Sequence, residues 1–228
     1  MLTGKLFVVP EQASLTDIAA RLQGFRLEEP FEAGDVKLTL VTEIKDLSMA
    51  GNRLSGKLSR DTVLFLNQRG TLVPALRTRE AFFSFHEYRG RVLLLILEKK
   101  FRANMLANLL SKILFVKVGS IVEARIPPEA LKAYHDTNAE DTKVVYFDDL
   151  DVPNVSKMAL YGSLLKETSL FGEYLKHGLL WYTVVRSNRF GYVVGVTRNG
   201  IVVVFNRIEL EEYVNFIANE IFPLISLP

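Results

Sequence analysis

The sequence of 228 residues contains no cysteine, so disulfides, thiolate nucleophiles and cysteine-ligated zinc or iron–sulfur sites are excluded. Long hydrophobic runs are also missing: the apolar stretches 92–97 and 179–185 are about a third of the roughly 20 residues that span a bilayer. The apolar run near the N-terminus stops at Pro10, too early for a signal-peptide core. We therefore expect a cytoplasmic protein with no membrane association.

The composition is that of a folded protein, with 49% hydrophobic and 24% charged residues, which excludes disordered and low-complexity classes. The formal net charge of +2 is too small to indicate a polyanionic partner by itself. Its distribution is uneven, because residues 69–117 carry a net +7, whereas residues 1–68 carry −1 and residues 118–228 carry −4. The central segment is therefore the candidate binding region.

Alternating apolar and polar residues, separated by turn signals, predict antiparallel strands over much of the chain. An amphipathic helix is predicted at about 100–114. Near the C-terminus, the Asn199-Gly200 turn predicts a hairpin, and a helix follows with Asn206 as N-cap and Glu209 as its capping-box partner. The pattern predicts an α+β fold made mainly of antiparallel sheets with packed helices.

Two segments, 88–113 and 197–221, share the order turn, apolar strand, amphipathic helix. This order suggests two related ββα-containing halves with a boundary near residue 117. Residues 1–117 would form an N-terminal β-rich α+β domain with a basic face. Residues 118–228 would form a C-terminal α+β domain, a three-stranded meander closed by the terminal helix. A single α+β domain is the alternative.

Basic side chains in residues 69–117 are interleaved with aromatic ones, which is typical of surfaces that pair cations with phosphates and rings with bases. On antiparallel strands, Arg77 and Arg79 share a face, as do Arg89 and Arg91. We expect one basic surface that contacts nucleic acid or an acidic protein partner, the alternative being a basic patch with no binding role. The candidate binding residues are Arg77, Arg79, Tyr88, Arg89, Arg91, Lys99, Lys100 and Arg102.

The string from Gly51 to Lys57 matches the phosphate-loop pattern G-x-x-x-x-G-K. A phosphate loop must connect a buried parallel strand to a helix, and it needs Ser or Thr where this chain has Leu58. Because residues 62–66 are predicted as a strand, we instead expect a glycine-rich hairpin turn with an exposed Lys57.

Three carboxylates, Asp148, Asp149 and Asp151, follow a predicted strand, where oxygen ligands could hold a divalent ion. They would carry the alternative function, a metal-dependent phosphate-handling enzyme such as a nuclease or nucleotidase. No spacing is diagnostic, the three histidines are isolated, and no G-x-S-x-G string occurs. We therefore favour a non-enzymatic binding or scaffolding subunit without a cofactor, in which this acidic segment is a solvated loop.

Overall fold

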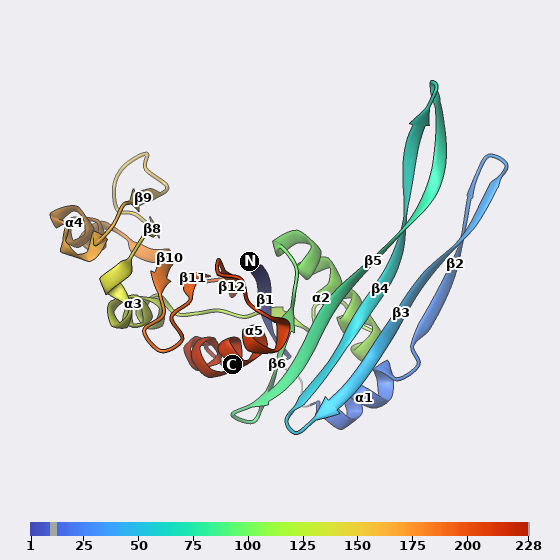
Figure 1. The fold of residues 1–228 in the computed structure, drawn as a ribbon, viewed down its shortest axis with the longest axis horizontal. Helices are drawn as coiled ribbons and strands as arrows, with labels where there is room; N and C mark the ends of the chain where they lie inside the picture. Colours follow the sequence, from blue (N-terminus) through green and yellow to red (C-terminus); the bar gives the residue numbers. More distant parts are fainter. Residues whose placement is uncertain (10–12, 228) are drawn as a thin grey trace. The chain divides into compact units, whose positions relative to one another are not determined.

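The computed structural model describes residues 1–9 and 13–227, which fold into two compact units (Figure 1). Unit 1 comprises Met1–Val8, Glu98–Asn104 and Val122–Pro228, and unit 2 comprises Val9–Leu97 and Met105–Ile121. The sequence predicts a boundary near residue 117 between two domains that each fold on their own. That boundary stays a prediction.

The described part of unit 2 is built on five antiparallel strands, each paired with the next along the chain. Tight turns make this order possible. At Arg69-Gly70 and Arg89-Gly90 both residues have positive φ, the conformation that joins two antiparallel strands with two residues. The strands are β2 (Arg26–Ala33), β3 (Val36–Ala50), β4 (Arg53–Gln68), β5 (Thr71–Tyr88) and β6 (Arg91–Ile96).

Two helices belong wholly or partly to unit 2. Helix α1 (Leu15–Leu22) begins after Ser14, whose hydroxyl accepts a hydrogen bond from the Asp17 amide. Its apolar residues recur at helical spacing, are buried, and pack on β3, β4 and β5. Helix α2 (Lys100–Phe115) runs from unit 1 into unit 2, where the Arg21 side chain donates a hydrogen bond to the carbonyl of Leu114.

Unit 1 contains a second antiparallel set of strands in the order β1, β12, β11, β10, β8, β9, and β7 also pairs with β1. The N-terminal strand therefore lies beside the last strand of the chain. The strands are β1 (Leu2–Val9), β7 (Val122–Glu123), β8 (Val144–Asp148), β9 (Met158–Tyr161), β10 (Leu179–Arg186), β11 (Val193–Thr197) and β12 (Ile201–Val204).

The helices of unit 1 cover one face of these strands. Helix α3 (Pro128–Thr137) packs on β10, and helix α5 (Leu210–Phe216) is tied to β12 by the buried Tyr213 hydroxyl, which donates to the Val202 carbonyl at 2.9 Å. Helix α4 spans Ser169–His177. Helix α5 is continued by a π-helical turn (Ile217–Ile221) and a 3₁₀ turn (Phe222–Leu224). Two further 3₁₀ turns are Ala139–Asp141 and Leu165–Glu167.

The predicted α+β class is wrong, because antiparallel sheet dominates: strands account for 45% of residues and helices for 29%. Apolar runs marked only a part of each of the long strands β3, β4 and β5, which have 15, 16 and 18 residues. Nor do two related halves describe the fold. Unit 2 is a consecutive meander, whereas unit 1 places its first strand beside its last.

Candidate nucleic-acid interface

The distal part of β4 and β5 is a free two-stranded ribbon, which we call the arm (residues 61–78). Pairing of β3 with β4 ends at Arg60, and pairing of β5 with β6 begins at Phe83. Beyond these points, the described strands pair only β4 with β5, over eight residue pairs from Asp61–Thr78 to Gln68–Thr71. Eight pairs extend roughly 25 Å at the usual rise per residue. In Figure 1 the arm extends as a hairpin of its own.

One face of the arm base carries three arginines, Arg60, Arg77 and Arg79, which we call the arginine cluster. Arg60 lies directly opposite Arg79, and Arg77 lies opposite Thr62, so alternation places all three side chains on one face. Within the described residues, none of the three forms an ion pair. No acidic residue occurs from position 62 to 79. The positive charge of this face is therefore uncompensated.

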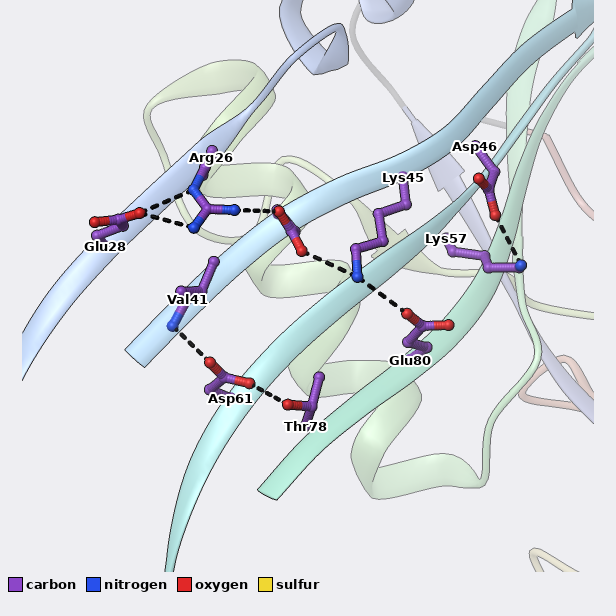
Figure 2. Close-up of polar contacts among 10 residues, drawn as sticks. Arg26, Glu28, Val41, Lys45, Asp46, Lys57, Asp61, Thr78 and Glu80 are labelled. Atoms are coloured by element: carbon purple, nitrogen blue, oxygen red, sulfur yellow. Dashed lines mark hydrogen bonds and ion pairs between the residues drawn. The ribbon is translucent and has the colours of Figure 1, made fainter. Parts of the chain in front are cut away.

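The opposite face of the same strands has compensated charges, as Figure 2 shows. Arg26 contacts the Glu43 carboxylate at 2.6 Å, and Lys45 bridges Glu43 at 3.0 Å and Glu80 at 3.3 Å. The hydrogen bond from Lys45 lowers the pKa of Glu43, so this carboxylate stays ionised. Because cations on this face have carboxylate partners, the arginine cluster is distinguished by its lack of them.

Lys57 of the phosphate-loop string belongs to this compensated face. It lies on β4, 2.7 Å from the Asp46 carboxylate (Figure 2). The string from Gly51 to Lys57 forms the β3–β4 turn and the start of β4, with no helix after it. The predicted glycine-rich hairpin turn is therefore confirmed.

Tyr88, Arg89 and Arg91 lie at the other end of β5, where the β5–β6 turn lines a pocket of about 650 Å³. The Arg89 guanidinium lies 5.1 Å from the centre of the Tyr88 ring. Nine residues of extended strand, roughly 30 Å, separate Tyr88 from Arg79. The pocket is also lined by Asp17 and Glu87, so its charge is mixed. The structure does not bring these residues together with the arginine cluster.

The remaining predicted cations, Lys99, Lys100 and Arg102, lie in unit 1. Arg102 is paired with Glu98 at 2.6 Å, and Lys100 stands near an ion pair between Lys5 and Glu123 of 2.7 Å. Lys5 is 0% exposed, and this burial lowers its pKa, while the contact with Glu123 opposes the shift. Lys99 and Lys100 are exposed, and none of the three cations belongs to the part of unit 2 that carries the arginine cluster.

The predicted acidic trio is engaged by other side chains of the protein. Arg198 donates hydrogen bonds to both Asp148 and Asp149, the latter at 3.1 Å, and Asp151 contacts His177 at 2.8 Å. Among residues 1–9 and 13–227, no group of three or more acidic or histidine side chains is placed to hold a metal ion. The described residues therefore form no metal site at the acidic trio.

Arg60 is the residue that sequence reasoning missed. The signal was present, because a two-residue turn at Arg69-Gly70 fixes the register of the hairpin and places Arg60 opposite Arg79. Arg60 precedes the positively charged segment 69–117, because it belongs to the first strand of the hairpin.

The chain matches no protein-family model and no curated protein. In the described ranges, no helix has both the length and the apolar character needed to cross a membrane.

Proposed function

We propose that this chain is a non-enzymatic binding subunit that contacts nucleic acid through the arm, with the arginine cluster pairing with backbone phosphates. The observation that supports this proposal is the cluster itself: three arginines without carboxylate partners on one face at the base of a free β-ribbon. Arginine presents a planar set of donors that matches phosphate oxygens, and each neutralised phosphate releases counterions.

The shape of the arm supports the same proposal. A two-stranded β-ribbon fits the major groove of B-DNA, which is about 12 Å wide. Near the tip the arm exposes apolar side chains on the face of the arginine cluster, Leu64 at 38% and Leu66 at 46% exposure. Apolar side chains that accompany arginines can pack against sugars and bases. An acidic protein partner would use the same cations, and the experiment below separates it from nucleic acid.

The test is fluorescence anisotropy with a labelled 20-base-pair duplex between 50 and 200 mM salt. If three arginines contact phosphates, log Kd should rise with log salt with a slope of about 2.7, which is roughly a 40-fold loss of affinity over this range. The variant Arg77→Glu should weaken binding at every salt concentration. Its matched control is Arg207→Glu, because Arg207 is exposed, lies in unit 1 and forms no ion pair in the described structure.

Absence of duplex binding at 50 mM salt, or binding that Arg77→Glu and Arg207→Glu weaken equally, would contradict the proposal. Polyglutamate serves as the second probe. If polyglutamate binds in a way that depends on Arg77 while the duplex does not bind, the acidic-partner alternative is correct instead.

A further inference from the structure

Unit 1 presents four aromatic rings on the face of its strands opposite the helices, and we call them the aromatic surface: Tyr146, Tyr161, Trp181 and Tyr182. Tyr146 on β8 lies directly opposite Tyr182 on β10. Their neighbours Phe147 and Leu180 are buried, and they point to the face that α3 and α4 cover, as strand alternation requires. A bulge between Leu180 and Tyr182 places Trp181 beside the same rings.

The four rings contact one another around Tyr146. Its ring centre lies 5.7 Å from that of Tyr161, 6.2 Å from that of Trp181 and 5.4 Å from that of Tyr182, and the Trp181 ring is nearly parallel to it, at 16°. The Tyr146 and Tyr161 hydroxyls are hydrogen-bonded. Such clusters normally lie in a core. Here Tyr161 is 67% exposed and the other three rings are half-buried, so the cluster is partly open to solvent.

The neighbouring strand is shaped to accommodate this surface. The Tyr182 ring lies across Gly195 of β11, and a Cβ atom at that position would be 2.5 Å from the Tyr182 hydroxyl oxygen. A side chain there would therefore lift the ring from the strands. Glycine at this position keeps Tyr182 flat on the sheet.

Cations surround Trp181. The Lys157 ammonium lies 4.4 Å from the centre of the indole ring, so the ring face already accepts a positive charge. Beside it is a pocket of about 470 Å³ in which Trp181 is accompanied by Arg125, Pro127, Pro128, Arg198 and Asn199. Arg198 is engaged with Asp148 and Asp149. Arg125 is exposed, and its side chain has no ion-pair partner among the described residues.

We propose that unit 1 binds unpaired bases of single-stranded nucleic acid at the aromatic surface, with a base stacked on Trp181 and the cations of Arg125 and Lys157 beside the phosphates. Exposed rings bordered by cations provide the two interactions that single strands require, stacking and charge neutralisation. A duplex cannot use the rings, since its bases are already stacked. A base on the indole face would displace the Lys157 ammonium, which is then free to pair with phosphate.

This site lies in residues that the arm does not share, so it stands whether or not the arm binds nucleic acid. Trp181 is the single tryptophan of the chain, and its fluorescence therefore reports the site alone. The full chain is titrated with an unlabelled ten-nucleotide thymidine oligonucleotide and with a blunt 20-base-pair duplex at 50 mM salt. We expect saturable quenching with the single strand and none with the duplex.

Affinity of a labelled single strand is measured in parallel by anisotropy on variants. Trp181→Leu should weaken binding roughly 5- to 150-fold, the range found when one base loses its aromatic partner. Trp181→Phe should restore most of the affinity, because a smaller ring still stacks. The matched control is Phe101→Leu, which removes an exposed aromatic side chain outside the surface and should leave binding unchanged.

No quenching by the single strand, or equal affinity of Trp181→Leu and wild type, overturns this proposal. If Trp181→Leu unfolds, Tyr146→Leu replaces it in the comparison, with the intact tryptophan spectrum as the check on folding. The variant Arg79→Glu should leave single-strand quenching intact. Failure of the arm proposal would therefore appear as lost duplex binding with quenching preserved, and failure of this proposal as the reverse.

Discussion

The arginine pair at the base of the arm predicts that one substitution increases stability and removes binding at the same time. Arg60 and Arg79 are directly opposite on β4 and β5, and both are half-buried. Like charges at such positions destabilise a sheet, whereas opposite charges stabilise it, each by roughly 0.2–1 kcal/mol. The variant Arg79→Glu converts repulsion into attraction.

The magnitude follows from the geometry of an antiparallel pair. Two unit charges about 5 Å apart interact by roughly 0.8 kcal/mol in water. Reversing one charge turns this repulsion into an attraction of equal size, so the interaction energy changes by at most twice that value. Because the side chains are flexible, we expect about 1 kcal/mol of added stability, or an increase in Tm of roughly 2–4 °C for a chain of this size. Duplex affinity should fall in the same variant.

Urea and thermal unfolding followed by circular dichroism of the strands provide the assay. The control is Arg77→Glu, because Arg77 lies opposite Thr62 and reversing its charge relieves no like-charge pair. It should weaken duplex binding as much as Arg79→Glu but leave stability within about 0.5 kcal/mol of wild type. At 1 M salt, where the screening length is about 3 Å, the gain of Arg79→Glu should disappear. Equal stability of the two variants at low salt would refute the reasoning.

Three further predictions concern unit 1. Burial raises the pKa of Tyr213 above its usual value of 10, so the folded chain keeps a proton that the unfolded chain loses. Above pH 10 this group should lower the free energy of unfolding, measured in urea at pH 9 to 12, by up to about 1.4 kcal/mol per pH unit, and the buried Tyr134 should add to the decline. In Tyr213→Phe this decline should be shallower, while stability at pH 7 falls by about 1 kcal/mol because the hydrogen bond to Val202 is lost; an unchanged slope would contradict the assignment. Glu123→Gln should lower the free energy of unfolding by about 3 kcal/mol, because it leaves the buried Lys5 ammonium without its carboxylate. Lys5→Met should lower it much less, because the Glu123 side chain is 41% exposed and can be solvated. Equal losses of stability in thermal unfolding would contradict this account of the ion pair.

Much of the local structure was predictable from the sequence. Helix α2 follows from the spacing of its apolar residues, and the β11–β12 hairpin from Asn199-Gly200. The N-cap of α5 is three residues later than predicted, because Glu209 and Glu212 form the capping box. Strand β2 was missed because half of its residues are charged and most are exposed, so they give no run of apolar residues. The pairing of β1 with β12 depends on contacts distant in sequence, which no local signal reports.

The candidate site was only partly predictable for a similar reason. Charge counting along the chain identified Arg77 and Arg79, but it also grouped them with Arg89 and Lys99, which the fold places at the far end of β5 and in unit 1. The sequence also did not show which cations have carboxylate partners, because the partner of a lysine or arginine lies on a neighbouring strand. The aromatic surface was missed because its rings come from three strands that are distant along the chain.

The bare edges of the arm have a consequence for solubility. An unpaired strand edge can recruit another strand, and exposed aliphatic side chains strengthen that tendency. Pro74 removes one amide donor from the arm, and Arg77 and Arg79 would repel the same residues of a second chain aligned beside it. The side chains proposed to attract phosphate thus also act as gatekeepers against aggregation. Recognition of a polyanion and resistance to self-association would then have a common molecular origin.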